Sequence, residues 1–215
     1  MRAYIFCPSH FLNKAKINIE ISSENLYIAA DSGINTAIAM GITPNLLMGD
    51  FDSIDMSLLD LDIYKNIKRV NHPKEKDDTD LTLAVKYSLG NGCKNIVIIG
   101  GIDGRTDHTL ANLYLLKYIK NMGGTGYITN GYNRIQYMSN SAVKIKKEYK
   151  YISVIPMSSE IQGLTLRNFK YPLDNATVKM QEAYTVSNEI LPDKEYGEIE
   201  ILNGDILICE CDDIL

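Results

Sequence analysis

Carboxylates gather in three short segments between Asp50 and Asp107, and each segment follows a strand-like stretch or opens a helical one. The segments are Gly49-Asp50-Phe51-Asp52-Ser53, Lys76-Asp77-Asp78-Thr79-Asp80 and Gly104-Arg105-Thr106-Asp107-His108. Carboxylates brought together repel one another unless a cation neutralises them. Hard oxygen ligands suit Mg²⁺, and the neighbouring Lys76 and Arg105 suit phosphate oxygens. The pattern predicts a magnesium-dependent enzyme that acts on a nucleotide or polyphosphate.

The first of these segments gives the strongest indication of metal binding. Gly49 before the two aspartates and Phe51 between them place Asp50 and Asp52 on one side of a tight loop. With Asp80, these two carboxylates are the predicted metal ligands. Aspartate also caps helices and forms turns, and that structural role is the preferred interpretation for three others. These are Asp55, Asp60 and Asp62.

A glycine-rich turn, Gly100 to Arg105, lies between an apolar strand-like run and a helical segment. Glycines let backbone N–H groups approach phosphate, and a helix start adds partial positive charge. The spacing is neither that of a P-loop nor that of a dinucleotide-binding fingerprint. His108 has either a capping role or a functional one at this helix start. His10 and His72 are predicted to be surface or loop residues.

The elements that must position these segments alternate between strand and helix. Strands are expected at 3–7, 26–30, 46–48, 68–70, 95–99 and 127–129, and helices at 32–40, 56–64, 79–89 and 108–119, with Asp78 or Thr79 capping the third helix. Such alternation predicts an α/β domain with a parallel sheet. Ligands of these sheets bind at the carboxyl ends of the strands, so the aspartate segments and Asp31 should share one edge.

The pattern changes in the second part of the chain, where no long helix is expected. Short strands are predicted at 143–147, 151–157, 164–166, 184–187, 197–202 and 206–211, and Asn203-Gly204 is a hairpin signal. This part should form a small antiparallel β-sandwich or barrel. A boundary within 131–140 gives an α/β catalytic domain over 1–133 and a β-rich domain over 134–215.

Composition excludes some classes of function. A formal net charge of −5 argues against a nucleic-acid binder that relies on a basic surface. The four cysteines form no C-x-x-C pair and are expected to be reduced thiols. No signal peptide or apolar run of membrane-spanning length is apparent, so we expect a cytoplasmic protein without a membrane partner.

Taken together, these motifs resemble those of the thiamine pyrophosphokinase family. The matching segments are Asp31-Ser32-Gly33, Gly49 to Ser53, Lys76 to Asp80, Gly104 to His108 with Asn112, and Ser187-Asn188-Glu189 in the β-rich half. The chain departs from the family pattern at Ser32, Ile34 and Asn45, and at Asp103, which stands where glycine is usual. It contains no Trp, so Tyr184 or another tyrosine would stack on thiamine.

The resemblance implies transfer of a pyrophosphoryl group from ATP to the hydroxyl of thiamine, giving thiamine diphosphate and AMP. Asp50, Asp52 and Asp80 would hold Mg²⁺, and either Asp77 or Asp107 would orient the hydroxyl or hold a second metal. Ser187 and Asn188 would contact thiamine. The residues expected to bind ATP are Asp31, Ser53, Lys76, Thr79, Gly104, Arg105, His108 and Asn112. A homodimer with the site between subunits is implied. The alternatives are a pyrophosphokinase for another alcohol, such as a pterin, and a non-catalytic nucleotide or thiamine sensor.

Overall fold

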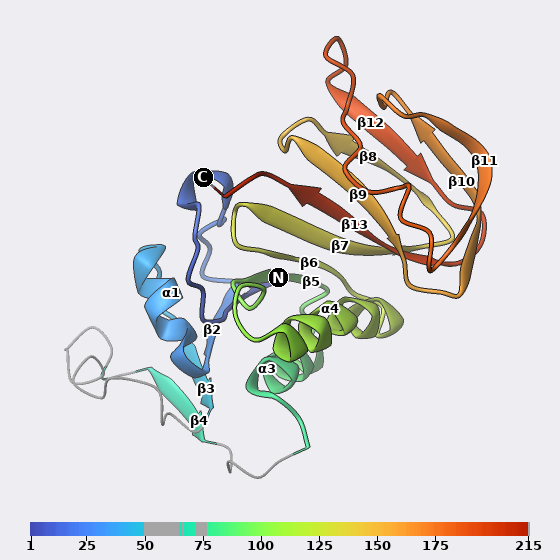
Figure 1. The fold of residues 1–215 in the computed structure, drawn as a ribbon. Coiled ribbons are helices and arrows are strands. Elements are labelled where there is room, and N and C mark those ends of the chain that lie inside the picture. Colours follow the sequence, from blue (N-terminus) through green and yellow to red (C-terminus); the bar gives the residue numbers. More distant parts are fainter. Residues whose placement is uncertain (50–64, 66, 72–76, 215) are drawn as a thin grey trace. The chain divides into compact units, whose positions relative to one another are not determined.

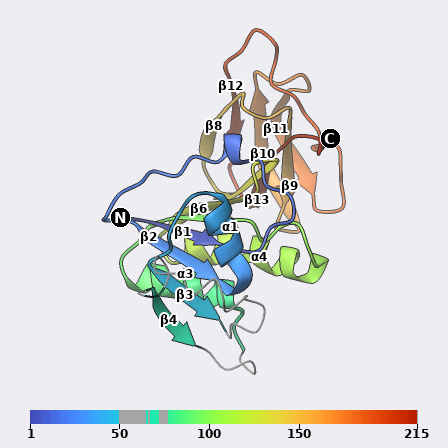
Figure 2. The same cartoon turned by 90° about the vertical axis from the view of Figure 1, so that its left-hand side faces the viewer.

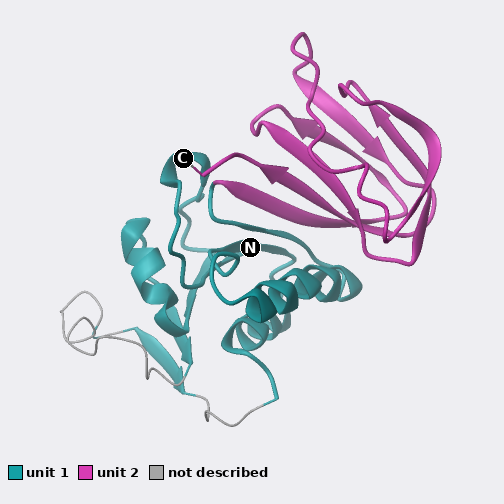
Figure 3. Cartoon of the chain, viewed as in Figure 1, with its two compact units in different colours: residues 1–131 teal, residues 132–215 magenta. Residues whose placement is uncertain are grey.

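The computed structural model describes residues 1–49, 65, 67–71 and 77–214, and the chain divides into two compact units. Unit 1 is Met1–Gly131 and unit 2 is Tyr132–Leu215 (Figure 3). Several expectations lie outside the described residues: those for Asp50, Asp52, Ser53, His72 and Lys76, and the helix at 56–64. Among the described residues, no helix is long and apolar enough to cross a membrane.

Unit 1 contains a parallel sheet with strand order β4-β3-β2-β1-β5-β6 (Figure 1). The strands are β1 (Arg2–Phe6), β2 (Leu26–Ala30), β3 (Leu46–Gly49), β4 (Lys68–Asn71), β5 (Asn95–Ile99) and β6 (Thr125–Thr129). The central strands are buried almost throughout, as expected where helices cover both faces of a sheet. The predicted α/β class is confirmed.

The helical elements of unit 1 pack on the two faces of this sheet. They are η1 (Lys14–Lys16), η2 (Asp31–Gly33), α1 (Ile34–Ala39), α3 (Asp80–Gly90) and α4 (Thr106–Asn121). Ala37 of α1 packs with Tyr4, Phe6 and Val97 on one face. Figures 1 and 2 show α3 and α4 beside each other on the other side of the strands. The third predicted helix begins as expected, because Thr79 is its N-cap and accepts the N–H of Thr82.

The strand register brings the segments after the strands to one edge. Phe6, the last residue of β1, is opposite Ala29 of β2 on one side and Ile99 of β5 on the other. Ile99 is in turn opposite Thr129, the last residue of β6. Because neighbouring parallel strands end almost level, the chain segments that follow them meet at the carboxyl edge of the sheet.

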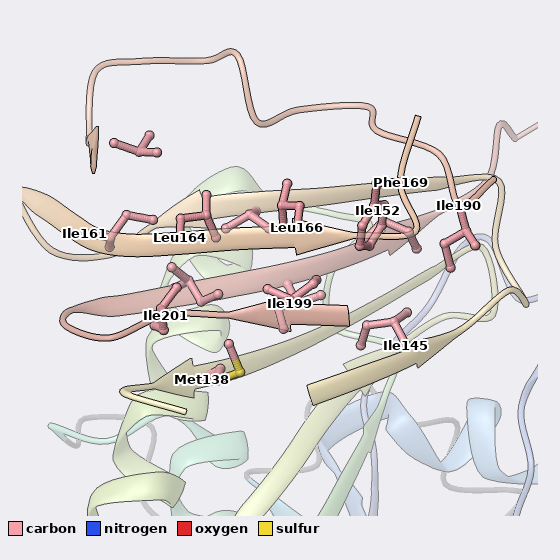
Figure 4. Close-up of a cluster of buried hydrophobic side chains, with 14 of the residues drawn as sticks. Met138, Ile145, Ile152, Ile161, Leu164, Leu166, Phe169, Ile190, Ile199 and Ile201 are labelled. Carbon is pink, nitrogen blue, oxygen red and sulfur yellow. The ribbon is translucent and has the colours of Figure 1, made fainter. Parts of the chain in front are cut away.

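Unit 2 is an antiparallel sandwich, which confirms the predicted class. One sheet has the order β7-β13-β9 and the other β11-β10-β12-β8. The strands are β7 (Asn133–Ser139), β8 (Ala142–Lys146), β9 (Tyr151–Pro156), β10 (Glu160–Arg167), β11 (Leu173–Lys179), β12 (Tyr196–Glu200) and β13 (Asp205–Cys211). Met138 and Ile152 from the first sheet share one apolar core with Leu164 and Ile199 from the second (Figure 4).

Two sequence expectations for unit 2 were wrong. Residues 184–187 form turns rather than a strand, and Ser187 has a left-handed backbone with φ +58°. Asn203-Gly204 does not close a hairpin, because β12 and β13 belong to different sheets. Strands β7 and β11 were not predicted at all. Strand β11 lies at a sheet edge and exposes most of its side chains, so it lacks a long apolar run.

Strand β7 was not predicted because its charged residue Arg134 looks like a surface residue in the sequence but is paired inside the sandwich. Arg134 donates from Nε and Nη2 to the two carboxylate oxygens of Glu210 on β13, at 2.7 and 2.5 Å. Burial raises the pKa of the Glu210 carboxyl, and the Arg134 guanidinium opposes that rise. The sequence pattern predicts Arg134 to be a loop residue. In the structure, its guanidinium neutralises the fully buried carboxylate of Glu210.

Candidate functional site

A cavity of about 470 Å³ lies at the carboxyl edge of the unit 1 sheet. Its lining comes from the segments after β1, β2 and β5, and from the starts of α3 and α4. The lining residues are Cys7, Pro8, His10, Ala30, Asp31, Asp77 to Leu81, Gly101, Asp103, Gly104, Arg105, His108, Thr109 and Asn112. The volume is that of a small-molecule site. The cavity therefore joins most of the described residues that the sequence singled out.

Gly49 at the end of β3 allows two of the carboxylate-bearing residues to approach the sheet closely. A Cβ at this position would lie 3.2 Å from the Cα of Asp31 and 3.6 Å from Cγ of Asp80. Its φ of +155° also disfavours other residues. Asp31 and Asp80 therefore flank the point from which the chain continues directly into Asp50.

Asp31 itself has an unusual backbone. Its φ is +52°, a left-handed conformation that costs free energy in a residue other than glycine. It opens η2, directly after β2. Strain of this kind persists where the surrounding structure holds the residue in place, and it is concentrated at functional sites. Here it turns the chain at the strand end, where Asp31 lines the cavity.

The pKa of the Cys7 thiol reflects its burial and the negative charge of nearby carboxylates. Burial raises the pKa of the Cys7 thiol to about 12, with smaller contributions in the same direction from the carboxylates of Asp31 and Asp80. The thiol is therefore protonated at neutral pH and is not a nucleophile. Two aspartates close enough to affect the same buried group form a local negative field that attracts a cation.

The turn after β5 is shaped by close backbone contacts. A Cβ on Gly100 would lie 2.5 Å from the carbonyl oxygen of Cys7, and Gly100 has φ +88°. Asn112, buried on α4, donates from Nδ2 to the Gly101 carbonyl oxygen at 2.7 Å. The Asn112 side chain thus fixes the glycine-rich turn as well as lining the cavity.

Arg105 and Asp107 form a two-pronged ion pair beside this turn. Nε of Arg105 is 3.1 Å from Oδ1 of Asp107, and Nη2 is 2.6 Å from Oδ2. The guanidinium lowers the pKa of Asp107 to about 2. Both side chains are mostly exposed, so the pair adds little to stability. It holds the arginine at the start of α4, at the rim of the cavity.

At the start of α3, the aspartates differ in their surroundings. Asp78 accepts a hydrogen bond from Nζ of Lys86 at 2.6 Å. Asp77 is exposed and lines the cavity, and Asp80 is the first residue of the helix. A carboxylate in the first helical turn interacts favourably with the helix dipole. All three aspartates line the cavity, and among them Asp78 is paired with Lys86.

Sequence reasoning missed the segment after β1. Cys7, Pro8 and His10 all line the cavity, although His10 was expected to be an uninvolved surface or loop residue. The signal was present, because any segment that follows a central strand of a parallel sheet reaches the carboxyl edge. It was overlooked because this segment carries no aspartate.

In unit 2, Ser187 and Asn188 have different environments. Ser187 is exposed, whereas Asn188 is buried and its side chain bonds internally. Asn188 Oδ1 accepts the N–H of Tyr171 at 3.0 Å, and Nδ2 donates to the Tyr171 carbonyl oxygen at 2.8 Å. The asparagine amide thus holds the main chain of Tyr171, whose side chain is 58% exposed. Its role is to fix a neighbouring aromatic residue rather than to present a free amide.

The oxygen donors near Gly49 are of the type that binds a hard cation. Across the described ranges, no group of three or more His, Cys, Asp or Glu side chains meets the geometry of a metal site. The carboxylate of Asp80 close to Gly49, and that of Asp31 in the cavity lining, nevertheless supply oxygen donors of the kind that Mg²⁺ prefers. The residues present therefore fit Mg²⁺ by ligand type.

Both parts of the chain are similar to known protein families. Residues 17–124 match the thiamin pyrophosphokinase catalytic domain, and residues 140–204 match the thiamin pyrophosphokinase vitamin B1 binding domain. Thiamine pyrophosphokinase of Bacillus subtilis is 34% identical over 77% of this chain and 78% of its own length. Thiamin pyrophosphokinase 1 of Caenorhabditis elegans is 26% identical over 84% of this chain and 80% of its own.

Solved structures agree with this similarity. The crystal structure of thiamine pyrophosphokinase from Bacillus subtilis has a TM-score of 0.87 and 30% identity, and covers 100% of both chains. The structure of the family protein from Enterococcus faecalis has a TM-score of 0.83 and 25% identity over the same full coverage. With both units matched in sequence and in fold, the chain belongs to the thiamine pyrophosphokinase family.

Proposed function

We propose that this ATP-dependent pyrophosphotransferase uses the unit 1 cavity to bind ATP with Mg²⁺ and transfers the terminal pyrophosphoryl group to the hydroxyl of thiamine. The observation that carries the proposal is the approach of Asp31 and Asp80 to Gly49, next to a cavity of suitable size. The family assignment supports thiamine over another alcohol as the acceptor.

Asp50, Asp52 and Asp80 are the proposed ligands of Mg²⁺. Asp50 follows Gly49 in the sequence, and Gly49 is flanked by Asp31 and Asp80, so the chain enters a region that is already negative. The cation, when bound, neutralises charge on the triphosphate and on these carboxylates. Asp31 contributes to the negative field and, with its strained backbone, supports the nucleotide end of the site.

Phosphate binding is assigned to cations and donors around the cavity. Arg105 has a planar guanidinium that grips phosphate oxygens in pairs, and Asp107 holds it in place until substrate arrives. Lys76 supplies a second positive charge. The proposed set is completed by Ser53, Thr79, Gly104, His108 and Asn112, of which the last four line the cavity.

The chemical step is an in-line displacement. The thiamine hydroxyl oxygen bonds to the β-phosphorus of ATP, the bond from that phosphorus to the oxygen bridging the α-phosphate breaks, and AMP leaves with that oxygen. The hydroxyl proton passes to a carboxylate, for which either Asp77 or Asp107 is the candidate. Asp77 is exposed at the cavity, whereas Asp107 is already paired with Arg105. Asp77 is therefore the better acceptor of the proton.

Unit 2 is proposed to supply the thiamine contacts, within a β-rich domain spanning 134–215. Ser187 is exposed at a turn, and the buried Asn188 beside it fixes the main chain of the exposed Tyr171. An exposed aromatic residue whose backbone is fixed by two hydrogen bonds offers a stacking surface that costs less to order on binding. We assign the stacking role to Tyr171 in preference to Tyr184. The active form is proposed to be a cytoplasmic homodimer with each site between subunits.

The reaction products test the function directly. Purified chain with ATP, Mg²⁺ and thiamine should release AMP together with thiamine diphosphate, and phosphorus NMR separates the signals. The Asp80→Asn variant is the matched control, because it retains size and should lose turnover. Initial appearance of ADP with thiamine monophosphate would contradict pyrophosphoryl transfer.

Two glycine-to-alanine variants, compared with each other, test the geometry around Gly49. Gly49→Ala should lower kcat by about tenfold or more, because the added Cβ displaces Asp31 and Asp80 from the metal region. Gly41→Ala is the control: this residue also has positive φ, +72°, but nothing lies within 4 Å of its Cβ position. The control should lose about 1 kcal/mol of stability and keep its kinetic constants. Equal loss of turnover in both variants would show that backbone strain alone is responsible.

The acceptor site can be tested through Asn188 and the tyrosine that it holds. Tyr171→Ala and Asn188→Ala should each raise the KM for thiamine more than the KM for ATP, since both disturb the stacking surface. Tyr171→Phe should stay near wild type, because stacking needs the ring and not the hydroxyl. Tyr184→Ala serves as a second exposed-tyrosine control. If only Tyr184→Ala changed the thiamine KM, the assignment to Tyr171 would be wrong.

Mixing two impaired variants, assayed at a thiamine concentration well below the raised KM of Tyr171→Ala, tests the subunit arrangement. Asp80→Asn carries its defect in unit 1 and Tyr171→Ala carries its defect in unit 2. If each site combines unit 1 of one subunit with unit 2 of another, a mixed dimer contains one site with both residues intact and recovers activity. Subunit exchange verified by mass spectrometry, with no recovery, would mean that each site lies within one chain.

A further inference from the structure

Asp103 makes a concentrated set of hydrogen bonds to the segment after β1. Its Oδ2 accepts from Ser9 Oγ at 2.8 Å, from the N–H of His10 at 3.0 Å and from the N–H of Phe11 at 2.7 Å. Ser9 and Asp103 are 94 positions apart in sequence. One carboxylate oxygen therefore gathers two successive backbone donors and a hydroxyl from a distant part of the chain.

These donors form a small anion-binding nest. Successive N–H groups that point at one oxygen create a local positive potential, which is the way loops bind phosphate or carboxylate. In this chain, the anion in the nest is the carboxylate of Asp103 itself. Three charge-assisted hydrogen bonds offset the negative charge at Oδ2.

The same two segments are also joined through their backbones. The N–H of Cys7 donates to the carbonyl oxygen of Ile99 at 2.8 Å, and the N–H of Gly101 donates to that of Pro8 at 2.9 Å. The hydrogen bonds of Asp103 continue the connection between the two segments from Ser9 to Phe11. His10 lies within the held segment and lines the cavity.

We propose that Asp103 is a positioning residue of the nucleotide site. Its carboxylate fills the nest formed by Ser9, His10 and Phe11 and fixes this segment before substrate binds, so that His10 is presented to the anionic triphosphate of ATP. The identity of the nucleotide rests on the proposed function. The positioning role itself rests on the hydrogen bonds to Oδ2 and on the place of His10 in the cavity lining.

A metal-binding or proton-transfer role for Asp103 fits the geometry less well. Oδ2 already accepts three hydrogen bonds from the segment after β1, so this oxygen is committed to that segment. A carboxylate arranged in this way serves as an acceptor for its own chain. Its effect on ATP must therefore pass through the segment that it holds.

Hydrogen exchange measures the clamp without reference to catalysis. In Asp103→Ala, the amide hydrogens of His10 and Phe11 should exchange about tenfold faster or more, because their acceptor is gone. Asp103→Asn keeps an acceptor oxygen and should restore much of the protection. Unchanged exchange at both amides in Asp103→Ala would overturn the proposal.

The affinity for a nucleotide analogue then shows whether Asp103 positions His10 for binding or has a purely structural role. The probe is the α,β-methylene analogue of ATP with Mg²⁺, whose bond at the transfer position cannot be cleaved. Its Kd should rise about fivefold to tenfold in Asp103→Ala, and the same change added to His10→Ala should have little further effect. Asn45→Ala is the control, since Asn45 accepts the N–H of Tyr27 at the opposite edge of the sheet. It should lose stability without a change in Kd.

These experiments distinguish failure of the Asp103 proposal from failure of the proposed function. If the wild-type chain binds the analogue but forms no thiamine diphosphate, the function is wrong and the positioning role stands on exchange and binding alone. Faster exchange with an unchanged Kd would reduce Asp103 to a structural clamp. Tighter binding in Asp103→Ala would show that the emptied nest recruits phosphate, and would likewise overturn the proposal. A wild-type chain that does not bind the analogue would overturn both.

Discussion

Crowded negative charge at the carboxyl edge of the parallel sheet is the constraint around which unit 1 is organised. Asp31 and Asp80 approach the same glycine, and their charges reach the buried thiol of Cys7. Repulsion between carboxylates would push such segments apart in isolation. The sheet resists this because paired strands fix where each segment begins, and apolar packing beneath the edge holds the strands. The carboxylates are thus gathered at an edge whose position is fixed by strand pairing and core packing.

Two positive side chains of the described residues near this edge are held by carboxylate partners. Lys86 is occupied by Asp78, and Arg105 by Asp107. These exposed pairs add little stability, since solvent screens them. Their effect is on geometry: each long side chain is restricted to one region before a ligand is present. Asn188 does the same in unit 2 by fixing the backbone of Tyr171. Preorganisation through partners recurs in both units.

The sequence predicted the alternating α/β half, the β-rich half and the grouping of aspartates after the strands. Those features depend on local patterns, such as the apolar run of β5 and the Thr79 cap. What it missed depends on contacts distant in sequence. Strand β7 was hidden because the partner of Arg134 is 76 positions away. The strand expected at 184–187 was wrong because Ser187 adopts a left-handed turn. His10 is a separate case, because its segment follows a central strand to the carboxyl edge and was overlooked for want of an aspartate.

The order of the segments along the chain has a consequence for how the protein is made. Every described residue that lines the cavity precedes Tyr132, and so do all the parallel pairings among the six strands of unit 1. Domains fold as units, beginning with the N-terminal one during synthesis. The carboxyl edge of the sheet, with its cavity, can therefore assemble on the ribosome while the sandwich is still being translated. A nascent chain that stops within the sandwich would already carry a complete set of cavity-forming segments.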